Sequence, residues 1–243
     1  MSLADLKTTK CSLAAAIFDV DGVLLASPHE RAWREALGGF ADPERLTTEL
    51  YESRVAGKPR LSGAIAILEA LGVKDAKQRA FTYAECKQKR LEELIHARDF
   101  AAFPDAIRFV QAVHELGWPM AVASSSHNAN QMMQAISLET GGSLLDMFTV
   151  NVCGRDLPRG KPDPAIFLLA AAELKLLPTK CFVVEDAPAG VEAARAGGMI
   201  VLGVARLNDS DVLRAAAADV VVTSLDEIAV DELAAGRLSR RAA

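Results

Sequence analysis

The feature that most constrains this chain is a short apolar run that ends abruptly in two acids. Residues 13–18 are all apolar, and Asp19-Val20-Asp21-Gly22 follows them directly. A continuous apolar run of this length is typical of a strand buried on both faces, as in a parallel sheet. The acids mark the turn at which this strand leaves the sheet, and we expect the chemistry of the protein to begin there.

The same pattern recurs in the second half of the chain. Largely apolar runs at residues 120–123, 148–152, 182–184, 200–204 and 220–222 alternate with segments long enough for helices. This alternation predicts an α/β fold with a doubly wound parallel sheet. Such sheets bind ligands beyond the carboxyl ends of their strands, so we expect the polar residues that follow the runs to converge.

Proline and glycine mark the ends of two of the intervening helices. Pro104 and Asp105 open one helix, which Gly117 closes, and residues 162–164 open an Ala- and Leu-rich helix that ends before Pro178. Proline in the first turn and glycine after the last are the usual boundary signals of a helix.

One long segment lacks strand-like runs. Residues 28–99 show helical periodicity, with Leu91 and Ile95 one turn apart on one face and charged side chains on the others. We therefore predict a core made of residues 1–27 and 100–243, into which residues 28–99 are inserted as a small helical domain, called the cap below.

Composition and charge limit the partners of the chain. Of its 243 residues, 51% are hydrophobic and 24% are charged, which is typical of a globular protein. The net charge of -5 disfavours a general electrostatic grip on nucleic acid or anionic lipid. We expect a small-molecule partner, no nucleic-acid or membrane partner, and a monomer.

The cysteines and the apolar runs indicate the compartment. Cys11, Cys86, Cys153 and Cys181 form no C-x-x-C pair or zinc spacing, so we predict buried free thiols in a reducing compartment. No apolar run reaches the roughly 18 residues of a membrane helix, and residues 13–18 are too few for a signal peptide. These observations predict a cytoplasmic protein.

The first candidate site is the pair Asp19 and Asp21. Alternate residues of a strand point the same way, so two carboxylates at this spacing can face one small volume once the strand gives way to a loop. Their repulsion then needs a cation, a proton or a positive side chain to relieve it. The alternative is a simple Asp-Gly turn with solvated acids.

A second acidic pair, Glu185 and Asp186, follows the run at residues 182–184. Carboxylate oxygens suit one hard divalent ion, and Mg²⁺ fits better than zinc because the chain offers no Cys/His set. The alternative is that both acids simply favour the dipole at the start of the next helix.

A serine triplet and a lysine complete the set of candidates. Ser124, Ser125 and Ser126 precede a helix that we expect to begin near Asn128, and hydroxyls with free N–H groups at a helix start can bind an anion. Lys161, held in a loop by the following proline, can neutralise both an acidic cluster and a phosphoryl group. The alternatives are helix-capping serines and a solvated surface lysine.

Three common ligand-binding motifs are missing. Gly160-Lys161 is no P-loop, because Gly154 lies one residue too far away and Pro162 stands where Ser or Thr is needed. The chain has no G-x-G-x-x-G, and no G-x-S-x-G flanks the serines, which argues against Ser-His-Asp hydrolysis.

Taken in chain order, these motifs resemble those of the haloacid dehalogenase-like superfamily of phosphoryl-transfer enzymes. The matching segments are Asp19-Val-Asp-Gly-Val-Leu, Val122-Ala-Ser124, Gly160-Lys161-Pro-Asp-Pro and Val184-Glu-Asp186-Ala-Pro-Ala-Gly. The resemblance covers nearly the whole chain after residue 13. It implies a Rossmann-like core with a helical cap, which agrees with the pattern of runs.

The resemblance also implies roles for these residues. Asp19 would be a nucleophile that forms an aspartyl-phosphate, and Asp21 a general acid/base. Ser124 and Lys161 would be ligands of the phosphoryl group. The cofactor Mg²⁺ would be held by Asp19, the backbone carbonyl of Asp21, Glu185 and Asp186. A carboxylate that attacks an anionic phosphoryl group needs such positive charge to offset repulsion.

Within the superfamily, the cap is similar to that of β-phosphoglucomutase and its phosphatase relatives. The resemblance implies that His29 couples cap closure to the acid/base, that Arg60 grips a distal phosphate, and that Lys87 contacts substrate. Ser126 and Asn128 match contacts to the distal phosphate. His127, however, stands where the mutase tends to have lysine.

The function implied is Mg²⁺-dependent phosphoryl transfer on a small phosphorylated sugar through an aspartyl-phosphate, as in β-phosphoglucomutase. The alternative is a sugar-phosphate phosphatase of the same superfamily. An alternative from another class is a non-catalytic phosphate-binding module, which would require a damaged motif, and all four motifs are intact.

Overall fold

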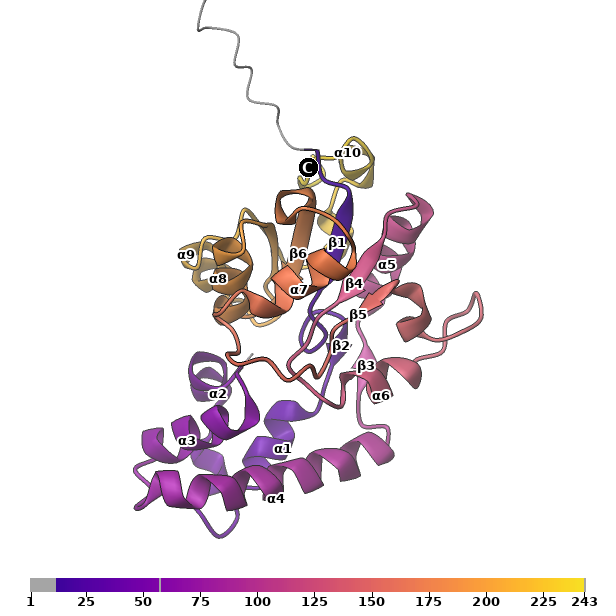
Figure 1. Cartoon of the computed structure of the whole chain (residues 1–243). Coiled ribbons are helices and arrows are strands. Elements are labelled where there is room, and N and C mark those ends of the chain that lie inside the picture. The colour runs from indigo at the N-terminus through magenta and orange to yellow at the C-terminus, as the bar shows by residue number, and fades with distance from the viewer. Residues whose placement is uncertain (1–11, 57, 243) are drawn as a thin grey trace, which may run out of the picture.

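The apolar runs form one parallel sheet in the computed structural model, which describes residues 12–56 and 58–242 (Figure 1). Its six strands lie in the order β5-β4-β1-β6-β7-β8, and every neighbouring pair is parallel. The strands are β1 (Ala15–Phe18), β4 (Met120–Val122), β5 (Val150–Asn151), β6 (Cys181–Glu185), β7 (Ile200–Val204) and β8 (Val220–Val222). The predicted fold class, a doubly wound parallel α/β sheet, is confirmed.

Helices cover both faces of this sheet (Figure 1). Successive residues of β1 point to opposite faces of the sheet, so Phe18 joins one hydrophobic cluster with Phe109, while Ile17 joins another with Phe167 and Val191. The helices of the core are α5 (Pro104–Glu115), α6 (Ala129–Gln134), α7 (Ala165–Glu173), α8 (Pro188–Ala196), α9 (Ser210–Ala215) and α10 (Val230–Ala234), with 3₁₀ turns at Leu144–Met147, Pro178–Lys180 and Leu225–Glu227.

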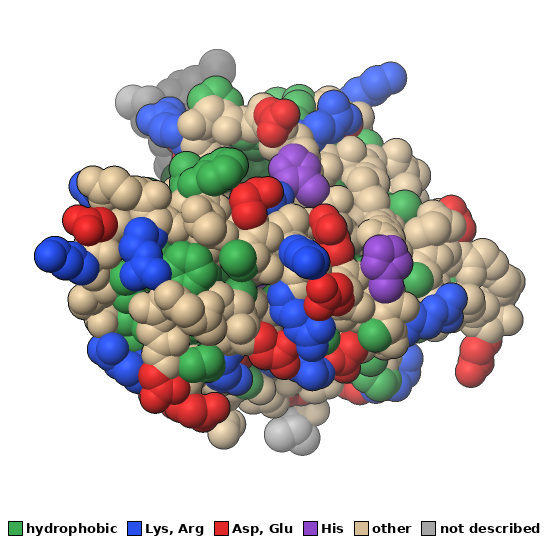
Figure 2. Space-filling view, turned by 90° about the horizontal axis from the view of Figure 1, so that it is seen from below, with side chains coloured by type: hydrophobic (Ala, Val, Ile, Leu, Met, Phe, Trp, Pro, Cys, Tyr) green, Lys and Arg blue, Asp and Glu red, His purple; other side chains and the backbone are tan. Residues whose placement is uncertain are grey.

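The cap consists of helices that surround a hydrophobic cluster of their own. They are α1 (His29–Glu35), α2 (Thr48–Arg54), α3 (Arg60–Ala70) and α4 (Ala76–His96), with a 3₁₀ turn at Pro43–Arg45. Trp33, Leu68 and Tyr83 are buried there, and the Tyr83 hydroxyl donates to the Trp33 carbonyl at 2.7 Å. The cap lies beyond the carboxyl ends of the strands (Figure 1). On its outer face, Lys and Arg side chains are interspersed with Asp and Glu side chains, so neither sign of charge dominates the view (Figure 2).

A small two-stranded ribbon joins the cap to the core. Strand β2 (Leu25–Ala26) leaves the core and pairs antiparallel with β3 (Ala101–Ala102), which returns to it. The backbone N–H of Phe103 extends the pairing by donating to the Leu24 carbonyl at 3.0 Å. Both crossings between core and cap therefore lie in this one hydrogen-bonded ribbon, which is called the root of the cap below.

The structure tests the sequence predictions for cysteines in part. Cys153 and Cys181 are buried free thiols, as predicted, but Cys86 is exposed, so that prediction is wrong for it. Cys86 lies on α4, whose polar face is turned to water. Cys11 lies outside the described residues. Among the residues that the structure describes, no helix is long and apolar enough to cross a membrane.

Phe182 provides a test of the core. Its ring is fully buried in β6 and packs edge-on against Phe109 and Trp118, with centroids 6.4 Å away in each case. We expect Phe182→Ala to lower the free energy of unfolding by about 3–5 kcal/mol, because it loses buried area and leaves a cavity. Urea unfolding followed by circular dichroism measures this.

Leu177 is the matched control, because 67% of it is exposed. We expect Leu177→Ala to change the free energy of unfolding by no more than about 0.5 kcal/mol. Equal losses for the two variants would contradict the assignment of Phe182 to the core.

Candidate active site

The register of the sheet brings polar residues from several loops together at the carboxyl ends of the strands. Strand β1 is level with β4 on one side and with β6 on the other. Asp19 directly follows β1, Ser124 lies two residues after β4, and Glu185 ends β6. The carboxyl ends of the strands and the cap enclose a cavity of about 500 Å³. All the residues selected from the sequence line it: Asp19, Asp21, His29, Arg60, Lys87, Ser124, Ser125, Ser126, Asn128, Lys161, Glu185 and Asp186.

Lys161 lies at the centre of the acidic groups. Its Nζ donates to Asp19 Oδ1 at 2.5 Å and also to Glu185 Oε1, and only 3% of its side chain is exposed. Burial opposes its charge, but attraction from Asp19 and Glu185 outweighs burial and raises the pKa of Lys161. Lys161 is therefore a buried ammonium ion, and the alternative of a solvated surface lysine is wrong.

Glu185 is fixed by contacts on both of its oxygens. While Oε1 accepts from Lys161, Oε2 accepts from the backbone N–H groups of Asp186 and Ala187 at 3.1 and 3.2 Å. A Cβ at Gly190 would lie only 1.9 Å from Oε1, so glycine is needed for α8 to approach this carboxylate. The sequence left two alternatives for Glu185, and its side chain both meets the start of α8 and belongs to the acidic cluster.

The acidic cluster can hold a divalent cation. Asp19, Glu185 and Asp186 each offer an oxygen within 4.8 Å of the others. Burial raises the pKa of all three carboxyl groups. Repulsion adds to this effect, from Asp21 at Asp19, from Asp19 at Glu185, and from Glu185 and Asp19 at Asp186. Three carboxylates against the single ammonium of Lys161 leave a formal charge of -2, which a divalent ion balances. An all-oxygen set of this kind suits Mg²⁺.

Asp21 is the second acid of the first motif and faces the cap. Ser124 Oγ donates to its Oδ2 at 3.5 Å, and His29 Nε2 lies 3.6 Å from its Oδ1. Among the described residues, Oδ1 of Asp21 is the buried side-chain oxygen without a hydrogen-bond partner. A buried acceptor without a donor is costly, so this oxygen is available to a substrate hydroxyl. Burial also raises the pKa of Asp21.

His29 links Asp21 to the cap. Lys87 Nζ contacts His29 Nδ1 at 2.9 Å, and because an ammonium ion can only donate, Nδ1 accepts and the ring proton lies on Nε2. Nε2 then faces Ser126 Oγ at 3.3 Å as well as Asp21. Burial, and then the charges of Lys87 and Arg60, lower the pKa of His29 well below its usual value. Burial lowers the pKa of Lys87 to about 7.

The serine loop forms a local hydrogen-bonded turn beside this group. Ser124 Oγ accepts the N–H of Ser126, and Ser126 Oγ accepts the N–H of Asn128, at 3.1 and 3.2 Å. Asn128 and Gln88 of α4 exchange amide contacts at 3.3 and 3.5 Å, which join cap to core. The N-cap residue of α6 is Asn128, and no side chain makes a capping hydrogen bond there, so the alternative of helix-capping serines is wrong; the serines line the cavity.

Several residues that line the cavity were not predicted from the sequence. Tyr51 and Glu52 reach it from α2, and Arg155 and Arg159 reach it from the loop before Gly160. Burial, with repulsion from Asp209 and Glu30, raises the pKa of Glu52 to about 7. Two arginines in a short loop before a motif are a signal that could have been used, whereas nothing in the helix sequence marks Tyr51 or Glu52.

Arg60 reaches the cavity from α3 and makes one weak ion pair there. It lines the cavity, but its Nη1 is drawn to Glu85 Oε1 at 3.6 Å. Both side chains are partly exposed, so this ion pair is weak and leaves the guanidinium free to meet an anion.

Comparison with known proteins identifies the family of the chain. A family model described as haloacid dehalogenase-like hydrolase matches residues 13–198. A phosphorylated carbohydrates phosphatase of Thermotoga maritima is 31% identical over 215 residues, which cover 86% of this chain and 94% of that protein. A β-phosphoglucomutase of Mycobacterium bovis is 30% identical over 240 residues, with coverage of 88% and 90%.

A solved structure has a similar fold. The archaeal β-phosphoglucomutase from Pyrococcus sp. strain ST 04 is 34% identical and superposes with a TM-score of 0.71, covering 90% of this chain and 96% of that one. The family match covers most of the chain, and the relatives span nearly their full lengths. The chain therefore belongs to the haloacid dehalogenase-like hydrolase family, in its β-phosphoglucomutase-like branch.

Proposed function

We propose that this chain transfers the phosphoryl group of a small phosphorylated sugar to Asp19, and from Asp19 to an acceptor hydroxyl, as a β-phosphoglucomutase does. The observation that carries the proposal is the contact of the Asp19 carboxylate with buried Lys161, in a cavity where a second acid, Asp21, has an oxygen free to meet a substrate. The relatives named above act on phosphorylated carbohydrates or are β-phosphoglucomutases.

In the first half-reaction, a carboxylate oxygen of Asp19 attacks phosphorus as the bond to the leaving sugar oxygen breaks. Asp21 gives its proton to that oxygen, and Lys161 and Ser124 hold the transferred group. In the second half-reaction, the acceptor hydroxyl gives its proton to Asp21 while its oxygen attacks phosphorus, and the bond to Asp19 breaks. Holding the reactants in line supplies most of the acceleration expected of such sites.

Mg²⁺ is the cofactor that fits this site. It would be held by Asp19, the backbone carbonyl of Asp21, Glu185 and Asp186. When bound, it offsets the negative charge of the phosphoryl group.

The cap, residues 28–99, is proposed as a separate domain that closes over the core, residues 1–27 and 100–243. A Cβ at Gly160 would lie 2.6 Å from Pro59 Cγ, so cap and core touch beside the cavity. We propose that His29, Arg60 and Lys87 hold the substrate from the cap, and that Ser125, Ser126 and Asn128 hold it from the core. A closed cap of this kind excludes water from the aspartyl-phosphate.

The second candidate is a sugar-phosphate phosphatase, in which water accepts the phosphoryl group. It is favoured by the phosphatase of Thermotoga maritima among the relatives, and by His127 where the mutase tends to have lysine. The mutase is favoured by the contacts of Gln88 with Asn128 and of Pro59 with Gly160, because they hold the cap against the core, as exclusion of water requires.

Asp19→Asn tests phosphoryl transfer itself. We expect wild-type protein with Mg²⁺ to turn over at least one member of a sugar-phosphate panel, chelation by EDTA to stop turnover, and the variant to lose on the order of 10⁴-fold in kcat because it lacks the nucleophile. Asp211→Asn is the matched control, since its side chain is almost fully exposed. Failure of the wild type to turn over any phosphoester would overturn the proposal.

The acceptor is tested by supplying β-glucose 1-phosphate with a trace of the 1,6-bisphosphate and following the products. The mutase proposal predicts glucose 6-phosphate, because the shielded aspartyl-phosphate meets a sugar hydroxyl before it meets water. Release of inorganic phosphate without glucose 6-phosphate would contradict the mutase proposal and establish the phosphatase.

The lowered pKa of Lys87 predicts a pH dependence of substrate binding. Its ammonium form exists below a pKa of about 7 and attracts the anionic substrate, so KM should rise as pH increases above about 7, approaching tenfold per pH unit. Lys87→Met should raise KM at pH 6 and remove this rise. Lys89→Met, an exposed lysine on the same helix, is the control. A wild-type pH profile in Lys87→Met would contradict the role of Lys87.

A further inference from the structure

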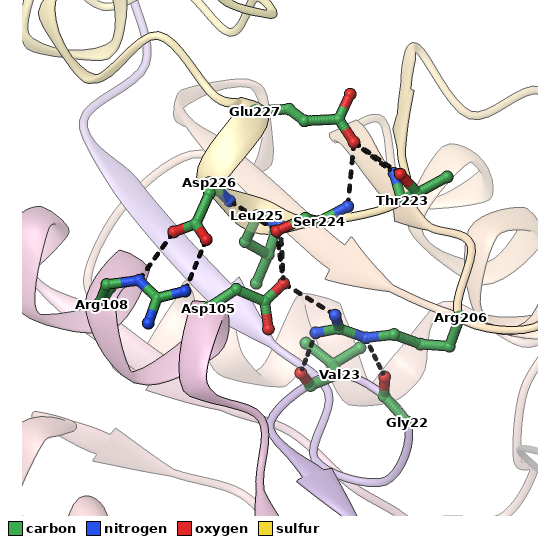
Figure 3. A network of polar contacts seen from close by, with 10 residues as sticks. All are labelled: Gly22, Val23, Asp105, Arg108, Arg206, Thr223, Ser224, Leu225, Asp226 and Glu227. Carbon is green, nitrogen blue, oxygen red and sulfur yellow. Dashed lines mark hydrogen bonds and ion pairs between the residues drawn. The ribbon is translucent and has the colours of Figure 1, made fainter.

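Arg206 is an arginine whose three nitrogens all donate into the protein. It follows β7 after one residue, and its side chain is 15% exposed. Nε donates to the Gly22 carbonyl at 3.2 Å, Nη2 to the Val23 carbonyl at 3.1 Å, and Nη1 to Asp105 Oδ2 at 2.7 Å (Figure 3). The two carbonyls belong to the loop directly after Asp21. One planar group therefore holds two consecutive peptide units of that loop.

Asp105 fastens the other side of Arg206 to the core. Besides Arg206, its Oδ2 accepts the Leu225 N–H at 2.8 Å and the Ser224 hydroxyl at 3.2 Å (Figure 3). Burial would raise the pKa of Asp105, but the hydrogen bonds from Arg206 and Leu225 outweigh burial and lower it. Asp105 is thus a carboxylate at neutral pH, and it anchors the arginine to the start of α5 and to the turn after β8.

Arg206 also reaches the root of the cap. Its guanidinium carbon lies 4.0 Å from the centroid of the Phe103 ring. Phe103 directly follows β3, and its N–H donates to the carbonyl of Leu24, next to the two residues that Arg206 holds. The arginine therefore joins the loop of Asp21, the returning crossing from the cap, and the sheet.

The loop that Arg206 holds has little room to move without disturbing the site. Gly22 has φ +80°, and a Cβ on it would lie 1.7 Å from Asp186 Oδ2, so its backbone lies against the acidic cluster. Asp21, the preceding residue, presents the oxygen without a partner. A displacement of about 1 Å in this loop would misplace the proposed acid/base, and misplacements of that size can cost about 10²-fold in rate.

We propose that Arg206 is a positioning residue that holds the loop of Asp21, and with it the root of the cap, in the geometry needed for proton transfer. The inference rests on the proposed function, because the position of this loop matters to catalysis only if Asp21 is the acid/base. Arg206 lines the cavity, but its donors are directed at the loop carbonyls and Asp105, so it is not assigned to substrate binding.

The test compares two substrates that differ in their need for an acid. A sugar phosphate leaves as an alkoxide and needs a proton from Asp21, whereas p-nitrophenyl phosphate has a leaving group that is stable as an anion. For Arg206→Met, we expect kcat/KM to fall about 100-fold with β-glucose 1-phosphate and less than about 5-fold with p-nitrophenyl phosphate. Arg206→Lys keeps a charge opposite Asp105 but lacks the planar fork, so it should keep the wild-type stability to urea while its kcat/KM for the sugar stays low.

Arg108→Met is the matched control. Arg108 pairs with Asp226 at 2.5 Å in the same polar network, but 58% of it is exposed and its ion pair lies on the far side of Asp105 from the loop (Figure 3). We expect it to leave both kcat/KM values unchanged. Hydrogen exchange of residues 20–26 should be faster in Arg206→Met than in the wild type and unchanged in Arg108→Met.

The outcomes separate the possible roles. Equal losses with both substrates, or a wild-type sugar rate in Arg206→Lys, would overturn the positioning role, as would a rise in KM for the sugar at unchanged kcat, which indicates substrate binding. Unchanged exchange in residues 20–26 would overturn it independently of activity. If the wild type turns over neither substrate, the proposed function fails, while the exchange experiment still decides whether Arg206 holds the loop.

Discussion

The candidate active site depends on one buried ammonium ion placed between carboxylates. Lys161 Nζ donates to both Asp19 and Glu185, which come from neighbouring strands of the sheet. Buried carboxylates brought this close repel one another, and removing the lysine would leave them buried and unpaired, at a cost of about 3–5 kcal/mol. The same contact directs Asp19 toward the cavity, so the interaction that makes the acidic cluster tolerable also orients the proposed nucleophile.

Much of this arrangement could be predicted from the sequence, because it follows from strands that end in polar residues. The run at residues 13–18 forms β1, and the run at residues 182–184 forms most of β6, so the level ends of these strands place Asp19 beside Glu185. Periodicity alone also indicated the helices between residues 28 and 99. The roles of these side chains remain proposals, whereas their convergence on one cavity is a property of the structure.

What the sequence could not show are features that arise from single residues or very short elements. Strands β2 and β3 have two residues each, too few for any period to emerge, yet they form the root of the cap. Nothing in the sequence marks Arg206, because one arginine after a strand forms no pattern. Its partners, Gly22 and Asp105, are 184 and 101 residues away in sequence and meet it only through the packing of strands and loops. The predicted burial of Cys86 is wrong, because the residue lies on the exposed face of α4 and the general preference of cysteine for the interior does not override that position.

The central claim is that the Asp19 carboxylate, held by Lys161, becomes phosphorylated during turnover. The most direct measurement is acid quenching of the protein during steady-state turnover of a sugar phosphate, followed by peptide mass spectrometry. The account predicts a phosphoryl group on Asp19 that disappears when substrate is exhausted. Turnover with no phosphoryl group on the protein, or with one on a different residue, would contradict it.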